Sequence, residues 1–434
     1  IQKEAMLDLV ETREYKQWKK WARKRGEEID LNGKQLNTFL FDVLKIKPIA
    51  FTEKGNAKVD DDLLRDIGRP FTQHLLAVRK MDKILGTYLA QIQREQVDGI
   101  LHPVFNIHLI DTYRSSADSP SFQNMPSRDP VMMALIKSVL FPSLGCHFGE
   151  GDFKGLEVGI GICYHQDPMM IKYWTDKTKD MHRDMAAACF KIDAGPEYWK
   201  TDFGKKTRYV GKNGFVFPSF YGSVWFQIAP AIWKHIKRMN LKAPGEIPMF
   251  EYLKSKGIAK LGSCDPREKP AKGTFARHIM DVENEFWNER FRVYNKWRKE
   301  WFAEYLKRGS FNTLTGFHIE GVLRRNQVLN YPIQGDAFHC LLWTIIRLNN
   351  WLKEEQMTSR LMGQIHDSMI MDLEPSESFD VLNTANNLIK YNIRREWTWI
   401  NVPLEAEFEV AAKDKSWSEK KPIILEKDCW RWVA

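Results

Sequence analysis

Two strand-like apolar stretches, far apart along the chain, each lead to an aspartate, and this pair constrains the fold most strongly. Residues 146–152 predict a strand that ends in a Gly-rich turn at Asp152. Residues 361–372 (LMGQIHDSMIMD) predict a β-hairpin whose turn contains Asp367. If these strands are neighbours in one sheet, the two carboxylates lie close together. The sequence therefore favours a sheet assembled from distant segments.

Two aspartates in such an arrangement have a definite chemical use. A carboxylate pair can hold two hard divalent cations about 3.5–4 Å apart, the geometry of in-line phosphoryl displacement. One cation lowers the pKa of an attacking hydroxyl group, and both neutralise charge that develops on the phosphorus oxygens. A single aspartate at a strand end is more often a cap or a turn residue, so the surroundings decide the interpretation.

The surroundings include a group of basic residues. Arg208 and Lys212 are spaced i,i+4 on a predicted helix and therefore share one face, and His182 lies upstream. Such a face could bind a triphosphate. The alternative is a solvated basic surface of the kind that many helices carry.

Composition excludes several classes of protein. The chain has 434 residues, enough for about two to four structural units, and a formal net charge of +9, which suits a polyanionic partner. Its 16 Trp, 13 Tyr and 25 Phe could stack on bases or fill a core. No apolar run reaches the ~18 residues of a membrane helix. The six cysteines form no CxxC pair, which argues against a disulfide scaffold or a cysteine zinc site and for a reducing compartment.

Hydrophobic periodicity predicts mainly helical structure in the first hundred residues, with a long helix over 71–96. Residues 169–306 also read as helical, apart from a Pro/Gly/Lys-rich stretch at 244–273 that we interpret as an insertion or a mobile loop. Mixed patterns precede and follow this region. The layout indicates one sheet-containing domain interrupted by a helical excursion.

Six stretches together resemble the polymerase portion of family A DNA polymerases, the class of bacterial DNA polymerase I and several phage replicases. The similarity begins near Trp21 and extends over nearly the whole chain. The stretches occur in the family's order: 112–128 (TYRSSADSPSFQNMPSR), 152–157 (motif A), 180–190 (DMHRDMAAACF), 208–222 (motif B, RYVGKNGFVFPSFYG), 330–337 (NYPIQGDA) and 364–367 (motif C, QIHD).

The resemblance implies an α+β right-hand polymerase fold with a thumb, a palm that carries an antiparallel sheet, and helical fingers. We place the thumb at 1–100 and the first part of the palm at 101–168. The fingers would span 169–325, with the insertion at about 244–273, and the second part of the palm would span 326–434.

The resemblance also implies roles for individual residues. Asp152 and Asp367, with the carbonyl of Phe153, would bind two Mg²⁺ ions, for which Mn²⁺ is an alternative. Arg208, Lys212 and His182 would bind the incoming triphosphate, and Lys212 would also act in catalysis by protonating the leaving pyrophosphate.

Further residues would select the sugar of the nucleotide and contact the DNA. Glu157 would be a steric gate against the ribose 2′-hydroxyl, Phe217 would lie against the sugar, and Tyr221 would pack beside the templating position. Contacts with primer and template near the new base pair, which test its shape, would come from Arg114, Gln123, Asn124, Arg128, Asn330, Gln334, Gln364 and His366.

The chain departs from the family pattern in two motifs. Motif B is one residue longer than usual, with nine steps from Lys212 to Tyr221 where the family usually has eight. In a regular helix the extra residue would rotate the later side chains by about 100°, so we predict a π-bulge or kink near Gly214 and Pro218 that restores the shared face. Motif C ends in Ser368, where the family commonly has Glu. These variants favour a phage or uncultured viral source.

The function implied is template-directed DNA synthesis from dNTPs on a primer–template, in replication or repair. A single-subunit phage-type RNA polymerase is one alternative, because it shares the His-Asp-Ser form of motif C; a small residue at position 157 would indicate it, and this chain has Glu157. A non-catalytic DNA-binding relic is another, but it would not need two metal-binding carboxylates and a triphosphate clamp.

The chain begins with Ile rather than Met, so we expect a piece of a longer protein, without an editing domain. We expect a monomer with no membrane association, in the cytoplasm of a bacterial or phage-infected cell, with an organelle as the alternative location. The sequence does not identify a processivity factor.

Overall fold

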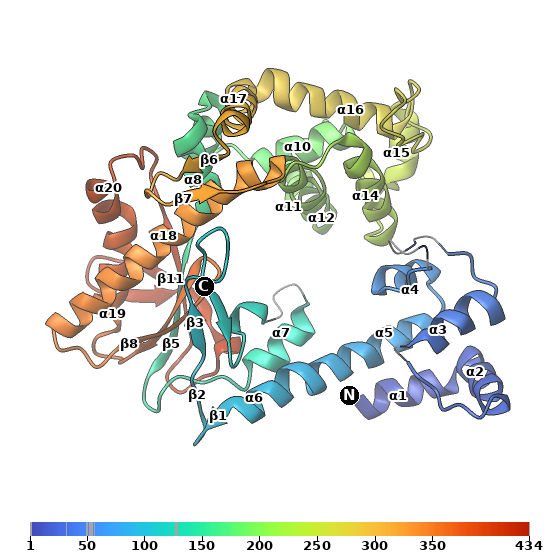
Figure 1. The fold of residues 1–434 in the computed structure, drawn as a ribbon, viewed down its shortest axis with the longest axis horizontal. Helices are drawn as coiled ribbons and strands as arrows, with labels where there is room; N and C mark the ends of the chain where they lie inside the picture. Colours follow the sequence, from blue (N-terminus) through green and yellow to red (C-terminus); the bar gives the residue numbers. More distant parts are fainter. Residues whose placement is uncertain are drawn as a thin grey trace. The chain divides into compact units, whose positions relative to one another are not determined.

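The computed structural model describes residues 2–31, 33–48, 51, 55, 57–125 and 129–433 (Figure 1). Its contacts divide the chain into two compact units. The first comprises Ile1–Val104, Ala117–Phe141 and Ser416–Glu419. The second comprises Phe105–Ser116, Pro142–Lys415 and Lys420–Ala434. The second unit contains all of the predicted fingers and most of the predicted palm, whereas residues 101–104, 117–141 and 416–419 of the predicted palm belong to the first unit. The limits proposed for the palm and the fingers stay predictions.

The first unit is mainly helical, as its sequence predicts. The rings of Trp18 and Phe39 stack 5.1 Å apart in a core that also contains Phe71. The expected long helix is confirmed, and it passes through a π-helical segment near its middle. The elements are α1 (Gln2–Glu11), α2 (Arg13–Lys24), α3 (Lys34–Thr38), η1 (Phe39–Val43), α4 (Asp61–Ile67), α5 (Pro70–Lys83), η2 (Ile84–Leu89), α6 (Ala90–Glu95), β1 (Gln96–Val97), β2 (Ile100–Leu101), η3 (Phe122–Asn124), α7 (Pro130–Lys137) and η8 (Trp417–Glu419). Strands β3 (Val104–Asn106) and β4 (Ser116–Asp118) fall where the chain passes between the units.

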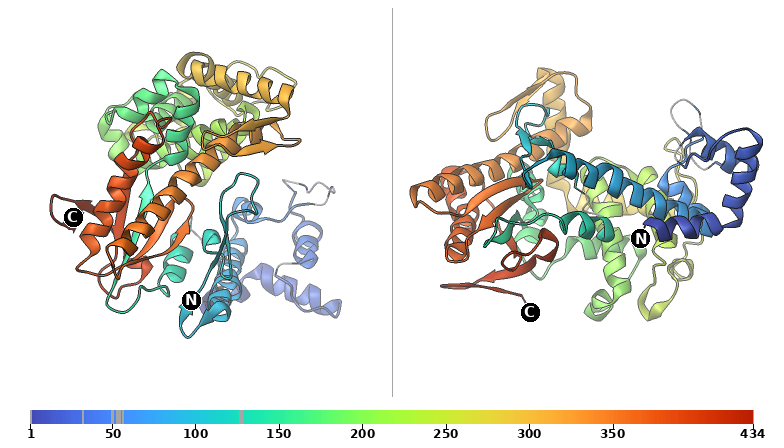
Figure 2. Two further views of the ribbon diagram at one scale, coloured as in Figure 1. Left: turned by 60° about the vertical axis from the view of Figure 1, so that its left-hand side comes forward. Right: turned by 90° about the horizontal axis from the view of Figure 1, so that it is seen from below.

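A six-stranded sheet forms the centre of the second unit, with the strand order β12-β11-β10-β5-β9-β8 and antiparallel pairing throughout. Helices α18 (Arg325–Glu354) and α19 (Ser378–Asn387) pack on it (Figures 1 and 2). The predicted sheet of distant segments is therefore present. Its strands are β5 (His147–Phe153), β8 (Arg360–Ile365), β9 (Ser368–Leu373), β10 (Ala406–Val410), β11 (Lys421–Leu425) and β12 (Trp430–Trp432).

The sequence of β5 alternates glycines with carboxylates for a packing reason. A Cβ atom on Gly149 would lie 2.5 Å from Leu373 Cδ1, and one on Gly151 would lie 2.8 Å from Phe408 Cε1. These glycines therefore leave room for core side chains of the two neighbouring strands. Because successive side chains in a strand point to opposite faces, Glu150 and Asp152 lie on the face away from that core.

The helical part of the second unit surrounds a core that includes Phe190, Phe215 and Phe275. The stretch at 244–273 is less irregular than we expected, because it contains η5 and α15, and α15 buries Met249 and Leu253. The helices are α8 (Leu156–His165), α9 (Pro168–Thr175), α10 (Met181–Phe190), α11 (Pro196–Lys200), α12 (Asp202–Val210), η4 (Gly211–Val216), α13 (Phe217–Phe220), α14 (Trp225–Arg238), η5 (Pro244–Glu246), α15 (Met249–Ser255), α16 (Phe275–Glu285), η6 (Phe286–Arg290) and α17 (Arg292–Arg308). The remaining elements are β6 (Ser310–Asn312), β7 (His318–Glu320), η7 (Leu388–Asn392) and α20 (Ile393–Glu396). Within the described residues, no helix combines the length and apolarity needed to cross a membrane.

Candidate active site

The structure brings the two predicted metal-binding aspartates together, with Asp152 in β5 and Asp367 in the turn just before the adjacent strand β9. Asp152 is the register partner of Ser368 in the ladder between β5 and β9, so it lies beside Asp367. The backbone N–H of Phe153 donates a hydrogen bond to the carbonyl oxygen of Asp367 at 3.4 Å. Because β9 is buried along its whole length, this register is fixed by packing and not by the turn alone.

Three side-chain hydrogen bonds hold the turn that carries Asp367 in place. His366 adopts a φ of 52°, as a tight hairpin turn requires, and Ser368 Oγ donates to the carbonyl oxygen of Ile365 at 2.9 Å. The Gln364 amide donates to the carbonyl oxygen of His366 and accepts from Ser115 Oγ at 2.6 Å. Gln364 is only 7% exposed, so in this structure it positions the turn.

The two carboxylates repel each other. Asp152 is exposed to solvent, but partial desolvation by the surrounding protein atoms, together with the charge of Asp367, raises its pKa to about 7. Burial and the charge of Glu157 also raise the pKa of Asp367. Arg114 Nη2 offsets part of this repulsion from 3.8 Å.

This donor set fits hard divalent cations. Two carboxylates whose charges are incompletely balanced, with backbone oxygens nearby, are the ligands that Mg²⁺ prefers. Within the described ranges, His, Cys, Asp and Glu side chains nowhere gather in threes that could hold a metal ion. Ions at Asp152 and Asp367 would therefore take further ligands from the backbone, such as the carbonyl of Phe153, from water or from a bound anion.

The predicted basic group is also assembled. Arg208 Nε donates to Asp180 Oδ2 at 2.6 Å, and Asp180 also caps α10, the helix that carries His182. Burial, followed by the charges of Arg208 and Lys212, lowers the pKa of His182 to about 4. Among the described residues nothing hydrogen-bonds to His182 Nδ1, although that atom is buried. A neutral imidazole with a free nitrogen can bind an anion from its N–H side.

The prediction of an irregular motif B helix is confirmed. Residues Gly211–Val216 form a π-helix between α12 and α13. Lys212 Nζ lies 5.1 Å from the centroid of the Phe217 ring, and His182 meets the same ring edge-on at 5.7 Å. The extra residue is thus absorbed, and Lys212 and Phe217 share a face. In contrast, Phe215 is completely buried against Phe286.

The residues predicted to select the nucleotide line a cavity of about 350 Å³. Glu157 accepts a hydrogen bond from the Tyr221 hydroxyl at 2.7 Å and another from Arg114 Nη1 at 3.3 Å. Burial and the neighbouring Glu157 raise the pKa of Tyr221, so its hydroxyl stays protonated and donates. The lining includes Arg114, Glu157, Phe217, Tyr221, Asn330, His366 and Asp367.

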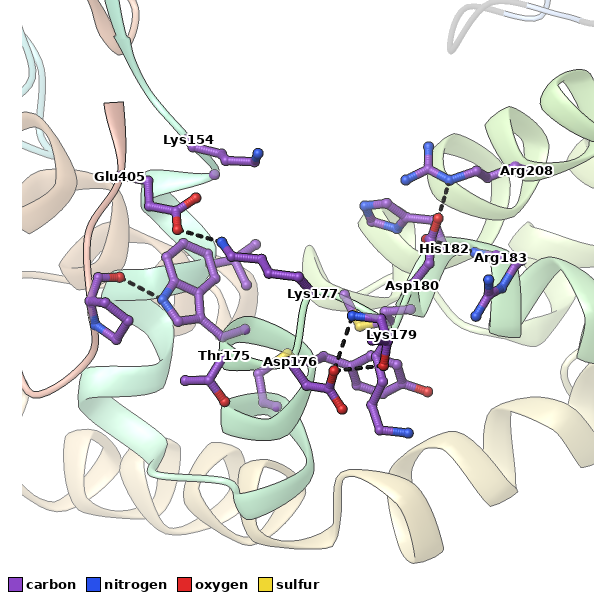
Figure 3. Close-up of a pocket in the computed structure, with 18 residues that line it drawn as sticks. Lys154, Thr175, Asp176, Lys177, Lys179, Asp180, His182, Arg183, Arg208 and Glu405 are labelled. Atoms are coloured by element: carbon purple, nitrogen blue, oxygen red, sulfur yellow. Dashed lines mark hydrogen bonds and ion pairs between the residues drawn. The ribbon is translucent and has the colours of Figure 1, made fainter. Parts of the chain in front are cut away.

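A second cavity, of about 630 Å³, adjoins the first, because Gly155, Val158 and Met170 line both. Figure 3 shows its two walls. On one side lie Lys154 and the ion pair of Lys177 with Glu405; on the other lie Asp180, His182, Arg183 and Arg208. Cationic side chains on both walls suit this cavity to a polyphosphate.

The other predicted contacts are spread along the chain. Gln334 follows Asn330 by one turn on α18. Gln123 and Asn124 belong to η3 of the first unit, and Arg128 lies outside the described residues. The predicted roles of all these residues in binding primer and template stay predictions.

Sequence reasoning missed several residues that hold this site together. Asp180 anchors Arg208, and a polar residue at a predicted helix start could have indicated it. Asp336, which is fully buried, accepts hydrogen bonds from the Tyr164 hydroxyl at 2.5 Å and from the backbone N–H of Leu314 at 2.9 Å. No local pattern signals these long-range contacts.

Comparison with known proteins gives a consistent result. A DNA polymerase of Bacillus phage SP01 is 24% identical over 423 residues, and DNA polymerase I of Lactococcus lactis subsp. cremoris is 23% identical over 421 residues. Each alignment covers 91% of this chain but only 41% and 40% of the respective relative. The chain therefore spans about two fifths of the length of these relatives.

A solved structure shares the fold. The POL domain of Pol1 from M. smegmatis, in a complex with DNA primer-template and dNTP, matches with a TM-score of 0.70 at 20% sequence identity. The match covers 96% of this chain and 65% of that chain. The predicted α+β right-hand polymerase fold is thereby confirmed.

The family itself follows from the sequence. A model of DNA polymerase family A matches residues 4–240 and 289–419, which together are most of the chain. The unmatched segment between these ranges includes the predicted insertion at 244–273. The chain therefore belongs to DNA polymerase family A.

Proposed function

We propose that this chain catalyses template-directed DNA synthesis, in which a dNTP is added to the 3′-hydroxyl of a primer and pyrophosphate is released. One observation carries the proposal: the adjacent carboxylates of Asp152 and Asp367 lie in the same unit as the cationic cavity that contains His182 and Arg208. The solved relative with primer-template and dNTP is consistent with these ligands.

In this mechanism the chain mainly positions and neutralises charge. Two Mg²⁺ ions, or Mn²⁺ in their place, would activate the primer hydroxyl and stabilise charge on the transferred phosphate. Asp152 and Asp367 would hold the ions. Arg208 would keep its orientation through Asp180 while it binds the triphosphate.

Two further residues complete the proposed clamp on the phosphates. His182, neutral at pH 7, would donate its ring N–H to a phosphate oxygen. Lys212 would protonate the leaving pyrophosphate from its place beside the Phe217 ring.

The alternative of RNA synthesis is disfavoured by the contacts of Glu157. Its two carboxylate oxygens accept hydrogen bonds from Tyr221 and Arg114, so the side chain is fixed within the cavity lined by Phe217. A fixed carboxylate in that position leaves little room for a 2′-hydroxyl. The alternative of a DNA-binding relic would leave the carboxylate pair and the π-helical register without a use.

Primer extension tests the proposal. The wild-type chain, with Mg²⁺, a primer–template and dNTPs, should extend the primer and should use NTPs poorly. Asp367→Asn should abolish extension while leaving duplex binding largely intact, because the substitution keeps the shape of the side chain and removes its charge. Failure of the folded wild-type chain to extend primers, or a preference for NTPs, would overturn the proposal.

A further inference from the structure

Lys154 stands directly next to the candidate metal site but has a partner other than the two aspartates. It follows the end of β5, and its backbone N–H donates to the carbonyl oxygen of Glu405 at 2.9 Å, which extends the pairing with β10. Side chains two residues apart in a strand share a face, so Lys154 lies on the same face as Asp152. It is therefore displaced from Asp152 along the strand, toward the larger cavity that it lines.

The ammonium of Lys154 is held by a carboxylate from the neighbouring strand. Lys154 Nζ lies 3.0 Å from Glu407 Oε1, and Glu407 is the register partner of Asp152. A diagonal pair of this kind is within reach of long side chains. Both side chains are more than half exposed, at 54% and 60%, so the ion pair is readily exchanged for another partner.

The opposite wall of the same cavity carries the residues assigned to the triphosphate. Figure 3 shows Lys154 extending toward the open space that separates it from His182 and Arg208. The cavity, at about 630 Å³, is large enough for a chain of phosphates to lie between the two walls. Two basic residues lie on the sheet side of the cavity. Lys177 is paired with Glu405, which itself lines the cavity, whereas Lys154 is paired with Glu407, which does not line it.

We propose that Lys154 is a further phosphate-binding residue, which exchanges Glu407 for the β- and γ-phosphates of the bound nucleotide and for the pyrophosphate that leaves. The site would then hold the polyphosphate between Lys154 on the sheet and Arg208 with His182 on the helices. This inference rests on the proposed function for the identity of the nucleotide, but the affinity for a polyphosphate is measurable without any reaction.

The exchange of partners predicts opposite effects of two substitutions on polyphosphate binding. Lys154→Ala removes the cation and should weaken polyphosphate binding. Glu407→Gln removes the competing carboxylate and leaves Lys154 free, so it should strengthen polyphosphate binding. A purely structural ion pair would give the same direction of change, or none, for both substitutions.

The test is equilibrium binding of inorganic tripolyphosphate to the full chain, measured by calorimetry without divalent metal so that only the protein's own cations bind it. We expect Lys154→Ala to weaken binding about fivefold and Glu407→Gln to tighten it about twofold, as for a charge-assisted contact at a half-exposed site. Lys154→Arg should stay close to the wild type. The matched controls are Lys421→Ala and Glu426→Gln, which change the net charge by the same amounts as Lys154→Ala and Glu407→Gln. Lys421 is an exposed residue of β11 in the same sheet, and Glu426 is an exposed residue just after that strand. Both controls should leave the affinity for tripolyphosphate unchanged.

Several results would overturn the proposal: no measurable binding by the wild type, equal affinity of Lys154→Ala and the wild type, or weaker binding by Glu407→Gln. Equal effects of the controls would also overturn it, because they would show that only net charge matters. These outcomes are separate from the proposed function, which fails only if the wild-type chain does not extend primers.

Discussion

Asp152 lies directly opposite Ser368 across the β5–β9 ladder, one residue from Asp367. The distance between the two carboxylates therefore depends on strand register, and a slip by one residue would turn Asp152 toward the core. Gly149 and Gly151 protect this register, because only a strand without Cβ atoms at those positions can lie against Leu373 and Phe408. The packing of the sheet therefore determines how close the two carboxylates lie.

The first prediction concerns selection of the sugar. Glu157→Ala should raise ribonucleotide incorporation relative to deoxynucleotide incorporation by about tenfold or more, because it removes a fixed carboxylate from the sugar's path. Tyr221→Phe should raise it by only about threefold, since it removes a single hydrogen bond of 2.7 Å to Glu157. Steady-state kcat/KM for matched NTP and dNTP pairs measures both. An unchanged ratio in Glu157→Ala would contradict the role of this residue.

The second prediction concerns the close packing of motif B on α10. A Cβ atom on Gly211 would lie 2.7 Å from the carbonyl oxygen of His182 and 2.9 Å from Ala186 Cα. Because backbone atoms cannot move aside cheaply, Gly211→Ala should lower the free energy of unfolding by about 2–3 kcal/mol. Urea denaturation measures the change.

The control for that substitution is Gly195→Ala, because a Cβ atom at Gly195 would meet nothing within 4 Å. Gly195 is the N-cap residue of α11, where alanine is less favourable than glycine, so this control should lower the free energy of unfolding by less than about 1 kcal/mol. Equal stabilities of the two variants would show that the contact between Gly211 and α10 does not constrain the motif.

The third prediction concerns stability in acid. The pKa of His182 is about 4 in the folded chain, against an ordinary value of 6.5 in the unfolded chain, since burial and the charges of Arg208 and Lys212 oppose protonation. The unfolded chain therefore binds more protons between these values, and folding stability is lost as pH falls from about 6.5 to 4.

The loss due to this residue should reach about 1–2 kcal/mol, after allowance for solvent screening. His182→Gln should remove it and flatten the pH dependence of the unfolding free energy over that range, which urea denaturation at several pH values measures. Identical pH profiles of the variant and the wild type would contradict the assigned pKa.

Much of the site was predictable because its signals are local or lie in motifs. The hairpin around Asp367 follows from two apolar runs and a polar turn. The π-helix in motif B follows from a count of residues between Lys212 and Tyr221, since an extra residue must be absorbed if the side chains that follow Lys212 are to share its face.

Other features were not predictable, because they depend on contacts between distant segments. The burial of Gln364 depends on Ser115, and the buried carboxylate of Asp336 depends on Tyr164 and the loop at 313–315. Helix α15 within 244–273 was not predicted, because the Pro, Gly and Lys residues around it favour a loop. Its residues Met249 and Leu253 nevertheless pack into the core. Tertiary packing overrides local composition in such segments.

The central claim is that Asp152 and Asp367 jointly bind divalent metal ions, and counting bound Mn²⁺ tests it most directly. The complex would contain the full chain, a primer–template with a dideoxy-terminated primer and the matching dNTP, so that no turnover occurs, and electron paramagnetic resonance would report the bound Mn²⁺. We predict two tightly bound ions per wild-type chain and the loss of at least one in both Asp152→Asn and Asp367→Asn. Equal numbers of bound ions in the wild type and both variants would contradict the account.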